Sequence, residues 1–116
     1  AESAEPVDRE ALIRRLGDED TVDQLGRIFC KDSPLLIDHC RAALEANSAE
    51  ELQRATHTGL GMLANMGAAR ALETAVLLDE IGRSGELLRA PAVIDELERR
   101  LEQARTAVAA WDDHAT

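Results

Sequence analysis

Few residue types in this chain could do chemistry beyond structural packing. They are three histidines, His39, His57 and His114, and two cysteines, Cys30 and Cys40. An imidazole near neutral pH can serve as a nucleophile, a proton carrier or a metal ligand. A thiolate can bind a metal or form a disulfide. The spacing of these residues decides which of these roles the chain supports.

The spacing disfavours metal, disulfide and hydrolytic chemistry. No C-x-x-C, zinc-finger or H-E-x-x-H pattern occurs. Cys30 and Cys40 point about 80° apart on a helix, so we interpret both as structural. A hydrolase would need a second catalytic group beside His57, but Glu50 lies two helical turns away and Arg54 is not a base. We expect His39 and His114 to be ordinary surface residues or buried residues with satisfied hydrogen bonds, and we expect no metal site.

His57 lies in the unusual stretch ATHTGLGMLANMG, residues 55–67. The stretch has helical periodicity, although each interior glycine costs roughly 1 kcal/mol relative to alanine. At about 100° per residue, His57 falls opposite the apolar stripe and should face solvent. The neighbours on its face are small or apolar toward the C-terminus, and they include Gln53, Leu60, Gly61 and Ala64. Such a floor would let another protein approach the imidazole.

The first half of the chain is predicted to form helices with recognisable caps. A short helix occupies residues 8–17, with aspartate at its start and glycine at its end. The next helix is expected to be capped by Asp20 or Thr21. Pro34 marks either a separate helix capped by Ser33 or a kink in one continuous helix.

The second half is predicted to contain three longer helices. A capping box, S-x-x-E, begins at Ser48 and opens the helix of His57, which should end at Gly67. The next helix ends at Gly82 or Gly85, and the last covers residues 90–111. No strand pattern competes with these helices. The expected fold is therefore all-α: an antiparallel four-helix bundle with a short extra helix at the N-terminal end.

Composition limits the setting of this bundle. The 116 residues suggest one domain, over residues 7–114, preceded by a linker or tail at residues 1–6. The formal net charge is −10, which argues against nucleic acid and against direct contact with an anionic membrane. No signal peptide and no apolar run of membrane-spanning length is visible, so a cytoplasmic location is expected.

The sequence from Val7 to about Ala68 resembles a histidine phosphotransfer (HPt) domain of bacterial two-component phosphorelays. Gly61 and Gly67 follow His57 by four and ten residues, as in that family. The other matching positions are Asp8, Leu12, Phe29, Asp32, Pro34, Leu36, Leu44 and Ala55. The order and length of the predicted helices extend the similarity over most of the chain.

The resemblance implies a relay rather than a kinase, and no nucleotide-binding G-x-x-x-x-G-K-[ST] loop occurs. His57 would be the phosphoacceptor, taking the group from a receiver-domain aspartate and passing it to another receiver, as the HPt module of a hybrid sensor kinase. Arg54, Leu60 and Gly61 would surround the phosphoryl group. The receiver would dock on Gln53, Leu60, Gly61 and Ala64. This domain would bind no cofactor, because the receiver brings the Mg²⁺.

Two positions depart from the family pattern. Leu60 stands where a lysine is usual, so Arg54 or a cation of the partner would have to offset the phosphoryl charge. Gly59 stands on the buried stripe, where a large apolar residue is usual, and we expect Met62 and Met66 to fill the space. The alternative function is therefore a degenerate HPt-like domain that binds a partner or dimerises without efficient transfer. The oligomeric state stays open.

Overall fold

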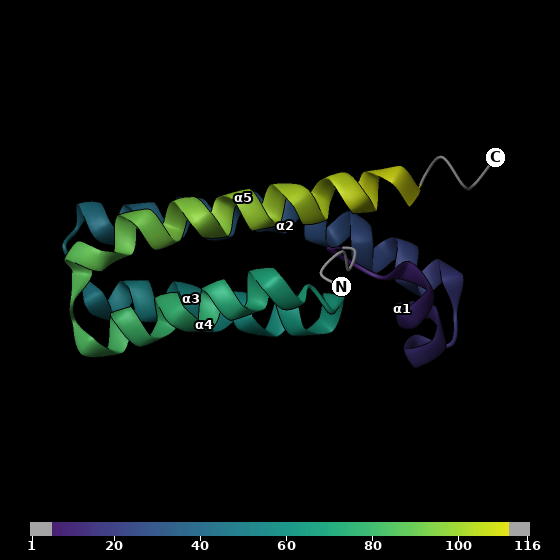
Figure 1. The fold of residues 1–116 in the computed structure, drawn as a ribbon, viewed down its shortest axis with the longest axis horizontal. Helices are drawn as coiled ribbons and strands as arrows, with labels where there is room; N and C mark the ends of the chain where they lie inside the picture. Colours follow the sequence, from purple (N-terminus) through teal and green to yellow (C-terminus); the bar gives the residue numbers. More distant parts are fainter. Residues whose placement is uncertain (1–5, 112–116) are drawn as a thin grey trace.

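The computed structural model describes residues 6–111, and these residues form an all-α bundle, as predicted (Figure 1). His114, the residues before Pro6 and the predicted C-terminal boundary lie outside the described part. The helices are α1 (Arg9–Leu16), α2 (Glu19–Glu45), α3 (Ala49–Met66), α4 (Ala69–Ser84) and α5 (Ala90–Ala109), with a short 3₁₀ turn at Leu87–Arg89. None of the helices in the described part is long and apolar enough to cross a membrane.

Helices α2, α3, α4 and α5 run along the long axis of the molecule, and α1 lies against one end of α2 (Figure 1). Their inner faces form one continuous aliphatic core, with Phe29 as its buried aromatic residue. The largest fully buried side chains come from the four long helices and from the segment before α1: Val7, Val22, Phe29, Leu52, Thr56, Leu63, Met66, Leu78, Ile81, Ile94, Leu97 and Leu101. Burial of this surface is the main force that holds the helices together.

Most predicted helix ends are confirmed by their cap geometry. Asp8 accepts a hydrogen bond from the Ala11 amide at 3.1 Å, and the Ser48 hydroxyl accepts one from the Glu51 amide at 3.0 Å. Gly67 has φ +68° at the end of α3, a left-handed conformation that glycine adopts without strain. The local cap signals therefore positioned α1 and α3 correctly.

The prediction for the start of α2 is wrong by a few residues. Asp18 is the cap: its carboxylate accepts from the Asp20 amide at 3.2 Å and from the Thr21 hydroxyl at 2.8 Å. Both residues predicted to cap the helix are thus donors to the true cap. At the other uncertain end, α4 passes through Gly82 and ends before Gly85, which has φ +79°.

Of the two alternatives at Pro34, the structure has the continuous helix. Helix α2 passes through Pro34, and Ser33 is not a helix cap. Ser33 is fully buried, and its hydroxyl accepts a hydrogen bond from Arg105 of α5 at 2.9 Å. Ser33 before the proline and Leu36 and Ile37 after it are buried. This tertiary packing keeps the chain helical, because it outweighs the local preference of the residue before a proline.

Candidate functional site

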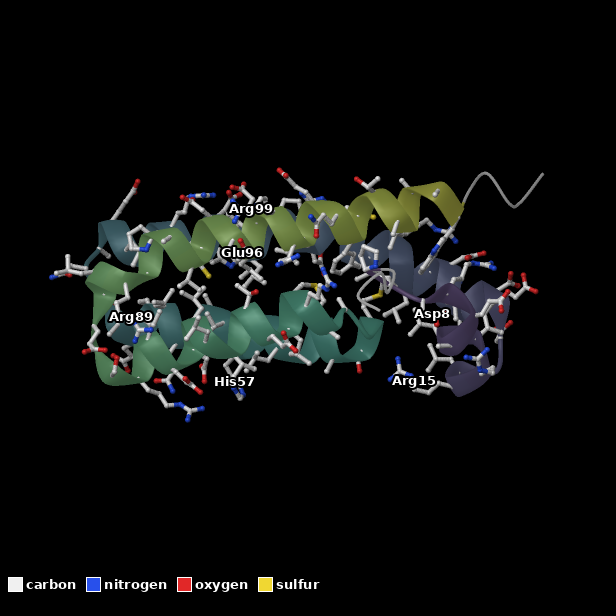
Figure 2. All side chains as sticks on the ribbon, viewed as in Figure 1. Asp8, Arg15, His57, Arg89, Glu96 and Arg99 are labelled. Atoms are coloured by element: carbon white, nitrogen blue, oxygen red, sulfur yellow. The ribbon has the colours of Figure 1, made fainter. Side chains whose placement is uncertain are left out.

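His57 lies in the middle of α3 with its side chain exposed, as the helical periodicity predicted. Figure 2 shows the imidazole pointing away from the bundle, off the side of α3. The other side chains of the bundle leave the ring accessible. An exposed imidazole on a helix is a suitable nucleophile for a group that another protein delivers.

The predicted neighbours of His57 share its face of α3. Gly61 and Ala64 are exposed, and Leu60 and Gln53 are half-buried. A Cβ atom built on Gly61 would meet nothing within 4 Å, so the surface one turn after His57 is open. The structure thus brings these residues together around His57.

Arg54, the predicted cation near the phosphoryl group, is engaged with its own helix. Its guanidinium lies 2.6 Å from the Glu51 carboxylate and 3.7 Å from that of Glu50. Its side chain is 62% exposed, so both pairs are weak. The two glutamates offset the positive charge of Arg54, which leaves it poorly suited to replace the family lysine.

The buried Gly59 has a different explanation from the one predicted. A Cβ atom built on Gly59 would lie 2.6 and 2.9 Å from the two methyl carbons of Leu36 on α2. Leu36 is buried against the bare backbone of α3, so α2 and α3 approach closely at this point. The prediction that Met62 and Met66 fill the space is wrong in this respect, because Leu36 occupies it.

A groove of about 780 Å³ lies between α2 and α3, on the flank of His57. Ile28 and Leu35 line it and are 53% and 48% exposed. His39 lines the groove too, whereas the sequence suggested only an ordinary surface or buried position. The other lining residues are Leu25, Phe29, Asp32, Leu36, Ala42, Ala43, Ala46, Glu51, Arg54, Ala55, Thr58, Gly59, Met62, Asn65 and Met66. Sequence reasoning missed this surface, because it depends on how α2 and α3 pack against each other.

On the other flank of His57, a polar network joins α3 to α4. The Thr56 hydroxyl donates to Asp79 at 3.1 Å, and Arg83 donates to the other oxygen of Asp79 at 2.7 Å. Thr56 and Asp79 are 0% and 3% exposed. Sequence reasoning missed this network as well. Its signal was an acidic residue within the apolar run AVLLDEI, with an arginine four residues later.

Metal and thiol chemistry have little support among the described residues. Within residues 6–111, no three His, Cys, Asp or Glu side chains gather in a way that could hold a metal ion. Cys40 is a free, buried cysteine. Burial raises the pKa of the Cys40 thiol to about 12, so it stays protonated and unreactive near neutral pH.

Comparisons with known proteins agree with this arrangement. Residues 24–107 match the Hpt domain family. The fold is similar to the crystal structure of histidine-containing phosphotransfer protein B (HptB) from Pseudomonas aeruginosa PAO1, with a TM-score of 0.87 and 31% sequence identity. The match covers 96% of this chain and 97% of the other. No curated protein sequence matches the chain.

Proposed function

Because the chain belongs to the Hpt domain family, with its histidine phosphotransfer role in phosphorelays, we propose that His57 is the residue that carries the phosphoryl group. A ring nitrogen attacks the phosphorus of a receiver-domain aspartyl phosphate. The N–P bond forms as the acyl O–P bond breaks, and the aspartate leaves as a carboxylate. The reverse reaction then loads a second receiver.

The observation that carries the proposal is the exposure of His57 above an open surface. The imidazole projects from α3, and the nearest position one turn later is Gly61, with free space above it. In-line attack requires the phosphorus of the receiver's aspartyl phosphate to come within van der Waals distance of the ring nitrogen. A side chain at position 61 would stand in the path of the incoming domain.

The groove between α2 and α3 offers the receiver a docking surface beyond the four predicted residues of α3. Its apolar residues Ile28 and Leu35 are largely exposed. Its rim carries both signs of charge, from Asp32, Glu51 and Arg54. An amphipathic helix of the receiver would bury the apolar residues and meet the charges at the rim.

The metal requirement of the proposed transfer belongs to the partner. Mg²⁺ held by the receiver would neutralise the phosphoryl oxygens during transfer. The proposed setting is cytoplasmic, with a hybrid sensor kinase as the source of the phosphoryl group, and it follows from the resemblance of this chain to phosphorelay domains.

Transfer from a phosphorylated receiver tests the proposal. The chain should take up acid-labile label from the receiver in the presence of Mg²⁺, and His57→Gln should take up none. His39→Gln is the matched control: it changes a second histidine, which lines the groove, and it should still take up acid-labile label. Labelling that persists in His57→Gln would refute the assignment.

The groove is tested in the same assay. Ile28→Ser and Leu35→Ser should slow transfer about tenfold each, the size expected for interface residues of moderate importance. Leu88→Ser is the control, because Leu88 is 99% exposed on the turn before α5 and does not line the groove. Equal rates for all three variants would place docking elsewhere.

The second candidate function rests on Leu60. A domain without the usual lysine could bind receivers through the same groove and transfer phosphate poorly. In that case the receiver would bind the unmodified chain and the His57→Gln variant with equal affinity. Neither of the two would take up label. Measured binding without labelling would therefore favour this alternative over the relay.

A further inference from the structure

Building on the proposed function, we propose that Asp79, itself bonded to Thr56, holds the Arg83 guanidinium beside His57. There the guanidinium donates hydrogen bonds to the phosphoryl group. Asp79 and Thr56 are positioning residues in this proposal. Arg83 is the group that touches the phosphoryl oxygens. The cation therefore comes from α4 rather than from the helix that carries the histidine.

The network is built around one buried carboxylate. One oxygen of Asp79 accepts from Thr56 at 3.1 Å, and the other accepts from Nη2 of Arg83 at 2.7 Å. The Asp79 side chain is 4% exposed and the Arg83 side chain 64%. A buried carboxylate needs such partners, because an unpaired charge in this position would be strongly destabilising. One nitrogen of the Arg83 guanidinium is thus bonded to a buried carboxylate, while the side chain remains largely exposed to solvent.

The register of the two helices puts this guanidinium near His57. Helices α3 and α4 are antiparallel, and Thr56, the residue before His57, faces Asp79. Side chains on a helix lean toward its N-terminus, so Arg83 leans back along α4 to Asp79. Its bond to that carboxylate therefore brings Nη2 to the level of Thr56, one residue from His57.

The phosphoryl group of His57 needs a cation that the rest of α3 does not supply. Leu60 is apolar at the position of the family lysine, and Arg54 pairs with two carboxylates, Glu50 and Glu51, whereas Arg83 pairs with one, Asp79. A guanidinium has five N–H donors in a planar fork, so Arg83 can keep its bond to Asp79 while it donates to phosphate. The carboxylate fixes the direction of the fork before any phosphate arrives.

The test uses phosphoramidate, a small donor that phosphorylates exposed histidines without a receiver. Phosphorus NMR of the full chain then reports the pKa of the phosphoryl group on His57. Contact with Arg83 should hold that pKa down, so Arg83→Gln should raise it, while Arg83→Lys should restore it in part. Glutamine retains a donor for Asp79, which keeps the fold. Arg89→Gln, at a similarly exposed arginine that pairs with Glu86, is the control.

The positioning roles have their own readout. Thr56→Val removes the hydroxyl at constant shape and should raise the pKa of the phosphoryl group in the same direction as Arg83→Gln, whereas Thr56→Ser should not. With a phosphorylated receiver as donor, Arg83→Gln should also label about tenfold more slowly, the equivalent of one lost charge-assisted bond.

Three results would overturn the inference: an unchanged phosphorus resonance in Arg83→Gln, an equal change in Arg89→Gln, or failure of His57 to react with phosphoramidate. Failure of the proposed function looks different. In that case the phosphorus resonance would still depend on Arg83, but no receiver would exchange phosphate with His57.

Discussion

The two sides of α3 meet their neighbours in different ways. Toward α4 the contact is tight and polar: the α3 backbone at Gln53 lies against Gly82, and Thr56 bonds to the buried Asp79. Toward α2 the contact is apolar, with Leu36 on Gly59 at its base and an open groove of about 780 Å³ beside it. His57 stands on the ridge between them.

This difference corresponds to two requirements of the phosphoacceptor role proposed for His57. The ring must be held in a fixed position, and a large partner must be able to reach it. The α3/α4 contact serves the first requirement, because a buried ionic network tolerates little displacement. The α2/α3 groove serves the second, because its exposed apolar residues have no partner within the described bundle.

The strongest test of the comparison is Gly59→Leu, which restores the bulk typical of the family. The new side chain would collide with Leu36, whose methyl carbons lie 2.6 and 2.9 Å from the position of a Cβ atom. We expect the free energy of unfolding to fall by about 3 kcal/mol, as for a severe overpacking mutation. Urea denaturation followed by circular dichroism measures the change.

Leu36→Ala provides the matched control for that experiment. Alone it should also destabilise the bundle, because it removes buried methyl groups. Combined with Gly59→Leu, it vacates the space that the new leucine needs, so the double variant should be more stable than the sum of the single effects predicts. Strict additivity would mean that the two positions do not share one space.

The features that the sequence predicted correctly are those that depend on residues close together in the chain. Caps such as Ser48 with Glu51 and the terminal Gly67 depend on a few neighbouring residues, so the sequence predicted them directly. Helical periodicity was enough to predict that His57 faces outward. Leu36 on Gly59 and Thr56 on Asp79 join residues 23 positions apart on different helices. A pattern within one helix does not identify the partner on another helix, and for that reason the packing of Gly59, the groove and the Thr56–Asp79 bond were missed.

The tight side of α3 is tested by Gly82→Ala. A Cβ atom there would lie 3.1 Å from the Gln53 amide nitrogen and 3.2 Å from its Cα, and backbone atoms cannot rotate away. Helices α3 and α4 would have to separate slightly, so we expect a loss of about 1 kcal/mol after the gain in helix propensity is included. Chemical denaturation gives the stability, and the phosphorus resonance of phosphorylated His57 should shift as the Thr56–Asp79 bond lengthens. If Gly82→Ala were more stable than the unmodified chain and its phosphorus resonance were unshifted, α3 and α4 would have room for a methyl group at position 82.

The smallest expected change in stability is that of Gly61→Ala, and its sign is opposite. The position is exposed within α3, and a Cβ atom would meet nothing within 4 Å. Alanine should therefore raise the free energy of unfolding by up to about 1 kcal/mol, because it lowers the entropy of the unfolded chain. Labelling by phosphoramidate should be unchanged, since the small donor needs no docking surface. Transfer from a receiver should slow, because the added methyl group lies where the partner approaches His57. If receiver transfer were equally fast, Gly61 would provide no clearance for docking, and its presence beside His57 would need another physical reason.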